Sequence, residues 1–171
     1  IFEPISSKLT SVKNSLSTKP YYSWPNTKNA KKIDVHMQGG AMGNLSKATF
    51  EGEERGLRDL ALKEAKLWAF NGNIGGYGLS LAEIEIGEVV VIKAWNDTAW
   101  PHAMHLHGHH FWVDSSEFGE KKRALLRDTY LMQPGEKAEL VFIANNPGAW
   151  LFHCHMLEHH AAGMGGVIYI S

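Results

Sequence analysis

Ten histidines occur among the 171 residues, and nine of them lie between His102 and His160. One group stands in the segment HAMHLHGHH, which begins at His102, and the other in HCHMLEHH, which begins at His153. Imidazole is the commonest metal ligand in proteins, so two dense groups of this kind predict metal chemistry. The only cysteine, Cys154, lies inside the second group. It excludes an intrachain disulfide and adds one soft sulfur ligand.

The spacing within each group sorts the residues into two sets. Successive side chains of an extended strand face opposite ways. His105 and His107 therefore share one face, whereas His102, at odd spacing, points elsewhere. The second group alternates likewise, with two histidines on one face and the cysteine on the other. The resulting sets are His105, His107, His153 and His155 on one side, and His102, Cys154, His159 and Met164 on the other.

The set that contains the cysteine has the ligands of a blue-copper site, in which two imidazoles and a thiolate are joined by a weak axial methionine. Soft sulfur stabilises Cu(I) and imidazole tolerates Cu(II), so such a site passes single electrons with little rearrangement. Structural zinc usually takes several thiolates, and this chain has one. A thiol nucleophile with a histidine base would leave the two His-x-His pairs and Met164 unexplained. Copper is also favoured over histidines of purely structural role.

Short β-strands must position these residues. Apolar, β-branched runs separated by Gly, Pro and Asn predict strands at 31–37, 67–71, 88–96, 105–113, 124–130, 137–144, 149–152 and 166–170. This spacing is typical of an all-β Greek-key sandwich or barrel. Residues 53–66 instead predict a short surface helix, because Leu57, Leu60 and Ala61 recur at helical spacing.

The first 66 residues are interpreted as a connector that carries the strand and the helix, and residues 67–171 as the domain proper. Residues 1–30 are polar, with an aromatic patch at Tyr21, Tyr22 and Trp24, and predict an extended N-terminal arm. The chain begins at Ile1 without a signal peptide, so we expect it to be processed or cut from a longer protein.

Composition excludes two classes of partner. Lys and Arg total 17 against 18 for Asp and Glu, so there is no electrostatic case for nucleic acid or for an anionic membrane. No apolar run approaches the roughly 20 residues that a membrane-spanning helix needs.

The segments HAMHLHGHHF and HCHMLEHHAAGM resemble the two C-terminal copper signatures of the multicopper oxidases, the family of laccases, ascorbate oxidase and bacterial copper-efflux oxidases. The segments WAFNG and GEVVVIKAWND resemble the strands that precede them in bacterial members. The resemblance covers residues 67–170 and implies the C-terminal cupredoxin-like domain of such an enzyme. Ala103 stands where the family usually has proline, a position that is not a ligand.

The resemblance also implies roles for the individual residues. The type 1 copper would be bound by His102, Cys154 and His159, with Met164 axial; the type 2 copper by His105; and the type 3 pair by His107, His153 and His155. Electrons from a small reducing substrate would enter near an exposed ligand imidazole. They would cross through Cys154 and its neighbours His153 and His155, and dioxygen would be reduced to water. His109 and His110 are expected to contact the ligands or to have structural roles rather than to bind metal, because better-spaced histidines already fill the coordination.

The resemblance implies a partner as well. The trinuclear cluster of this family takes eight histidines, of which this chain would supply four, and the only histidine before residue 102 is His36. The others would come from N-terminal cupredoxin domains of the same precursor or from a second chain. The expected location is periplasmic or secreted. A stand-alone blue-copper electron carrier is the main alternative, and a copper nitrite reductase-like protein a weaker one.

Overall fold

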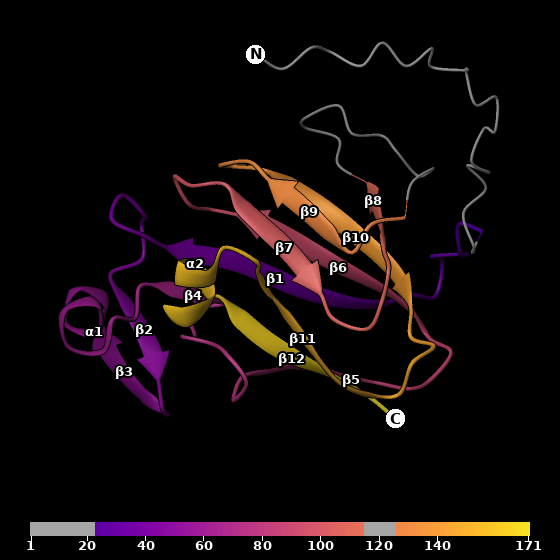
Figure 1. Ribbon diagram of the computed structural model, residues 1–171, viewed down its shortest axis with the longest axis horizontal. Coiled ribbons are helices and arrows are strands. Elements are labelled where there is room, and N and C mark those ends of the chain that lie inside the picture. Colours follow the sequence, from indigo (N-terminus) through magenta and orange to yellow (C-terminus); the bar gives the residue numbers. More distant parts are fainter. Residues whose placement is uncertain (1–22, 115–125) are drawn as a thin grey trace, which may run out of the picture.

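The computed structural model describes residues 23–114 and 126–171. Most of the arm expected over residues 1–30, and the beginning of the strand predicted at 124–130, lie outside these ranges. Two five-stranded sheets pack face to face as a β-sandwich (Figure 1). This arrangement confirms the expected all-β architecture.

In spatial order, the first sheet contains β4 (Trp68–Phe70), β1 (Lys31–Gly39), β6 (Val89–Asn96), β10 (Lys137–Ile143) and β8 (Trp112–Asp114). The second contains β5 (Ser80–Ile84), β12 (Gly165–Ile170), β11 (Gly148–Cys154), β7 (His102–Leu106) and β9 (Thr129–Met132). A hairpin of β2 (Lys47–Phe50) and β3 (Glu53–Gly56) lies with helix α1 (Leu57–Glu64) at one end of the sandwich (Figure 1). A short helix, α2 (Leu157–Ala161), follows β11.

The core lies between the two sheets and is built by alternation along the strands. In β1, for example, Ile33, Val35 and Met37 are buried, whereas the residues between them are more exposed. Phe142 of β10 and Phe152 of β11 are fully buried in the same cluster, so both sheets contribute to one core. Period-two burial of apolar side chains is the pattern that a two-layer sandwich requires.

The sequence predicts that the domain begins at residue 67, but the β-sandwich begins earlier in the chain. β1 is parallel to β6 and pairs with it from Lys31 to Met37, so it is an interior strand of the first sheet. The predicted helix over 53–66 is also too long, because residues 53–56 form β3. Glu51 and Gly52 both have positive φ, 52° and 83°. This backbone suits the tight turn of a β-hairpin, and the pairing with β2 overrides the helical periodicity.

The strand predicted over 105–113 is broken into two. β7 ends at Leu106 in the second sheet, and β8 begins at Trp112 in the first. Gly108, in the connection, has a φ of 70°, and a Cβ atom there would lie 2.4 Å from the Trp150 side chain. Only glycine fits a turn with this backbone and this close neighbour.

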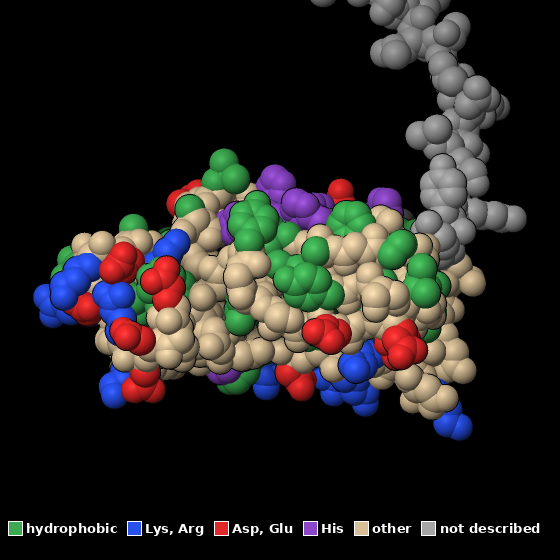
Figure 2. Space-filling model, turned by 90° about the horizontal axis from the view of Figure 1, so that it is seen from below, with side chains coloured by type: hydrophobic (Ala, Val, Ile, Leu, Met, Phe, Trp, Pro, Cys, Tyr) green, Lys and Arg blue, Asp and Glu red, His purple; other side chains and the backbone are tan. Residues whose placement is uncertain are grey.

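Charged side chains gather at the end of the molecule formed by α1, β2 and β3, whereas histidine side chains gather along one edge (Figure 2). The charged end contains ion pairs of Arg55 with Asp59 and Glu64, and of Lys47 with Glu54. Among the described residues, no helix is long and apolar enough to cross a membrane.

Candidate metal centre

Adjacent strands β7 and β11 hold four of the eight residues of the two sets: His102, His105, His153 and Cys154. Their antiparallel register pairs His105 with His153 and Met104 with Cys154. Along β7, His102, Met104 and Leu106 are buried while the residues between them are only partly buried. The alternation expected from the sequence is therefore present in β7, with His102 on the core side of the strand and His105 on the other.

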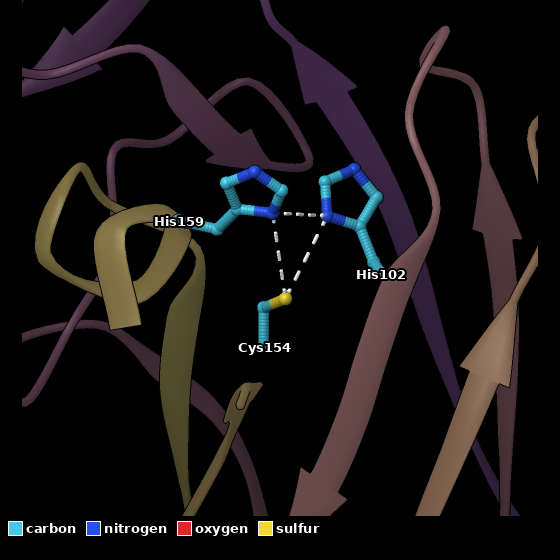
Figure 3. Close-up of side chains that lie close together, drawn as sticks. All are labelled: His102, Cys154 and His159. Atoms are coloured by element: carbon cyan, nitrogen blue, oxygen red, sulfur yellow. Dashed lines mark hydrogen bonds between the residues drawn. The ribbon is translucent and has the colours of Figure 1, made fainter. Parts of the chain in front are cut away.

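His102, Cys154 and His159 converge from three elements, as Figure 3 shows: β7, the end of β11, and α2. The Nδ1 atoms of the two histidines lie 3.0 Å apart. The Cys154 Sγ lies 3.7 Å from Nδ1 of His102 and 3.6 Å from Nδ1 of His159. Only four residues separate Cys154 from His159 in the sequence, so a short stretch of chain supplies two of the three groups.

The triangle of donor atoms has the size of a metal site. A point equidistant from the three atoms lies about 2.0 Å from each, within the roughly 2.0–2.3 Å of metal bonds to imidazole nitrogen and thiolate sulfur. Two nitrogens and one sulfur in this arrangement are the donors that copper takes in electron-transfer sites. The residues present therefore fit the metal that the sequence predicts.

Burial sets the protonation of these groups. Desolvation, and secondarily the neighbouring His159, lowers the pKa of His102 to about 3, so its ring is neutral near pH 7. Desolvation also lowers the pKa of His159 and raises the pKa of the Cys154 thiol. A buried thiol without a nearby cation keeps its proton, and a bound metal ion replaces that proton with its own charge.

Trp68 forms one wall of this triangle, a role that the sequence did not reveal. It is buried at the start of β4, with its ring centroid 4.9 Å from that of His102 and 4.7 Å from that of His159. Its backbone N–H donates to the carbonyl of Ala162, just after α2. This contact ties the edge of the first sheet to the segment that carries His159.

His105, His107 and His153 form a second group, whose candidate ligand atoms all lie within 4.8 Å of one another. Nε2 of His107 lies 2.9 Å from Nε2 of His153. The Nδ1 atoms of His105 and His153 lie 2.7 and 2.8 Å from the carbonyl oxygens of Asp128 and Cys154. A carbonyl only accepts, so both rings donate from Nδ1 and keep the Nε2 lone pair for a metal.

Burial lowers the pKa of His153 to about 4, with smaller contributions from neighbouring histidines, and also lowers the pKa of His107. Neutral imidazoles are the form that binds metal. The three side chains differ in exposure: His153 is buried, His105 is partly buried and His107 is exposed.

The remaining predicted ligands are placed less tightly. His155 is exposed, and its ring centroid lies 5.4 Å from that of His105 and 5.8 Å from that of His153. Met164 is fully buried, and its backbone is bonded to both ligand segments: its N–H donates to the His159 carbonyl, and its carbonyl accepts from the Cys154 N–H. The ligand roles of both residues stay predictions.

Comparison with known proteins gives one consistent family. The multicopper oxidase family profile matches residues 53–171. The iron multicopper oxidase fer1 of Mycosarcoma maydis is 33% identical over 117 residues, which cover 58% of this chain and 18% of that protein. An L-ascorbate oxidase of Cucurbita pepo var. melopepo is 36% identical over 106 residues, covering 53% and 19%. The chain matches less than a fifth of the length of these relatives.

Solved structures agree. The McoA multicopper oxidase of Aquifex aeolicus has a TM-score of 0.64 at 24% identity, with 86% of this chain and 30% of that chain covered. A multicopper oxidase of Campylobacter jejuni, titled a metallo-oxidase, has a TM-score of 0.66 at 23% identity, with 85% and 31% covered. At these identities the structural likeness establishes the fold, which is cupredoxin-like as expected.

Proposed function

The chain belongs to the multicopper oxidase family, and on that premise we propose that it is the electron-accepting C-terminal domain of an oxidase that reduces dioxygen to water. The observation that carries the proposal is the triangle of His102, Cys154 and His159, whose donor atoms surround a point at metal-bonding distance. These three residues, together with Met164, would hold the type 1 copper. Copper bound there would supply one-electron redox chemistry between Cu(II) and Cu(I).

The protein's own part is to hold the donors in place and to keep water away. The side chains of His102 and Cys154 are fully buried. The Trp68 ring packs against the imidazoles of His102 and His159. Two imidazoles and a sulfur fixed in this way need little rearrangement when the charge of the site changes. His159 is only partly buried, so a small reducing substrate would approach on its side.

Cys154 links this site to the second group by covalent bonds. It is joined by peptide bonds to His153 and His155. His153 lies opposite His105 in the strand pair, and its Nε2 lies 2.9 Å from Nε2 of His107. We propose that His105, His107, His153 and His155 would hold part of a cluster of type 2 and type 3 coppers, and that this short covalent path would connect the two copper sites. N-terminal cupredoxin domains or a second chain would complete that cluster.

The test uses the protein as isolated from its source. Copper content, optical and electron paramagnetic resonance spectra, and oxygen uptake with a small reductant are measured on the same sample. We expect a blue type 1 signal, more copper than one ion per chain, and oxygen uptake. Cys154→Ser should abolish the blue band and the uptake, whereas His110→Gln, an exposed histidine outside both groups, should keep both. One blue copper without oxygen uptake would contradict the proposal and identify an electron carrier.

A periplasmic or secreted location is part of the proposal and rests on the family resemblance alone. Fractionation of the source cells, followed by immunodetection of the chain, should find it outside the cytoplasm. Detection with cytoplasmic markers would contradict this location without affecting the assignment of the copper ligands.

A further inference from the structure

A buried chain of hydrogen bonds ends on the ring nitrogen of His102 that faces away from Cys154. Nε2 of His102 lies 2.8 Å from Oγ1 of Thr98, which lies 2.7 Å from Oδ1 of Asn96. All three residues are buried. A neutral imidazole carries one proton, on either Nδ1 or Nε2. The position of that proton decides whether Nδ1 can bind a metal.

The direction of the chain starts at Asn96. Its Nδ2 faces three backbone carbonyl oxygens, at 2.8 Å from Trp100, 3.0 Å from Gln133 and 3.3 Å from Met132. Carbonyl oxygens only accept, so the amide group must present its NH₂ to them and its oxygen to Thr98. The amide cannot be flipped without placing oxygen against three oxygens.

The Thr98 hydroxyl then has one use for its single proton. The Asn96 Oδ1 at 2.7 Å only accepts, so the hydroxyl donates to it. The only other oxygen acceptor among the described residues is the Trp100 carbonyl, at the longer distance of 3.1 Å. In either case the hydroxyl proton points to an oxygen and is not directed at His102. The hydroxyl also accepts from the Trp100 N–H, at 3.2 Å. Its remaining lone pair can only accept, so His102 must donate from Nε2.

We infer that Asn96 and Thr98 are positioning residues that fix His102 in the tautomer with its proton on Nε2 and its lone pair on Nδ1. That lone pair points into the triangle, 3.0 Å from Nδ1 of His159 and 3.7 Å from the Cys154 sulfur. The ring is therefore prepared for a metal before one arrives. The consequence for copper rests on the proposed function, whereas the tautomer is a property of the copper-free chain.

If Asn96 and Thr98 had only a structural role, the expected effect of removing their hydrogen bonds would be different. The same bonds also hold the connection between β6 and β7, since Asn96 ends one strand and bonds to Trp100 just before the other. If closing this connection were their only task, removing the Thr98 hydroxyl would lower stability without moving the proton of His102. The position of the proton therefore separates the two roles.

The experiment measures the ¹⁵N shifts and the two-bond couplings of the histidine rings in the copper-free chain near pH 7. In the unsubstituted chain we expect the His102 proton on Nε2; a proton on Nδ1 would overturn the inference without any variant. Thr98→Val removes the hydroxyl at nearly constant volume, and Thr98→Ser keeps it as the matched control. We expect a mixed tautomer in the valine variant and the original tautomer in the serine variant.

Copper affinity is then measured by competition with a chelator. Partners of metal-bound histidines typically change affinity by about 10–100-fold when removed, so Thr98→Val should bind copper at least about tenfold more weakly, and Thr98→Ser should recover the affinity. An unchanged tautomer in a folded valine variant would overturn the inference, and so would a changed tautomer with unchanged affinity. Absence of oxygen uptake would instead count against the proposed function and leave the tautomer result standing.

Discussion

Acid should destabilise the copper-free chain through the buried ring of His102. Desolvation and the nearby His159 lower the pKa of this group from 6.5 to about 3 in the folded chain, whereas the unfolded chain keeps a value near 6.5. Between these values the unfolded state binds a proton that the folded state does not, so the free energy of unfolding falls as the pH drops through this window. At about 1.4 kcal/mol per pKa unit, the loss between pH 7 and pH 4 is about 3 kcal/mol from this residue.

Urea unfolding, followed by tryptophan fluorescence at several pH values, measures this loss directly. His102→Phe has no proton to bind, so its stability should fall by about 3 kcal/mol less than that of the unsubstituted chain over the same range. Met104→Leu is the matched control, because Met104 lies on the same buried face of β7 and carries no titratable group. It should lower stability at every pH and keep the full acid dependence. Parallel losses in the unsubstituted chain and in His102→Phe would refute the reasoning.

Three further outcomes follow from the structure. Gly108→Ala should lower the free energy of unfolding by about 1–3 kcal/mol, because the φ of Gly108 is 70° and an added Cβ would meet Trp150. Gly78 has open space around an added Cβ, so Gly78→Ala should leave the free energy of unfolding, measured by chemical denaturation, nearly unchanged. Met164→Leu should raise the midpoint potential of the blue copper in a redox titration, since the axial sulfur would be lost; an unchanged potential would remove Met164 from the ligands. Copper at about 1,000 times its dissociation constant should stabilise the chain by about 4 kcal/mol, and calorimetry that finds no rise in melting temperature would contradict binding to the folded state.

The separation of the two histidine sets could be predicted because it depends only on strand alternation. His102 and His105 lie in one strand at odd spacing, and the structure buries the first and leaves the second partly exposed. The pairing of His105 with His107 was expected for a reason that does not hold, since β7 ends at Leu106. The two rings still lie 4.9 Å apart, and the backbone N–H of His107 donates to the Leu151 carbonyl, which keeps this residue beside β11.

Features that depend on distant parts of the chain could not be predicted. Trp68 covers the site from the other sheet, 34 residues before His102, and no local pattern distinguishes it from other core tryptophans. The tautomer of His102 depends on the carbonyls of Met132, which ends β9, and of Gln133, which follows it, as well as on Thr98. The sequence predicts a helix that includes residues 53–56, but the pairing of these residues with β2 overrides this weak local preference.

X-ray absorption spectroscopy at the copper edge, on the chain loaded with one equivalent of copper, tests the central claim most directly. The triangle predicts one sulfur and two imidazole nitrogens bound to the metal, with the sulfur contribution lost in Cys154→Ser and one nitrogen lost in His159→Ala. A copper ion bound by nitrogen and oxygen alone, with a spectrum that Cys154→Ser leaves unchanged, would contradict the assignment of His102, Cys154 and His159 as the electron-accepting site.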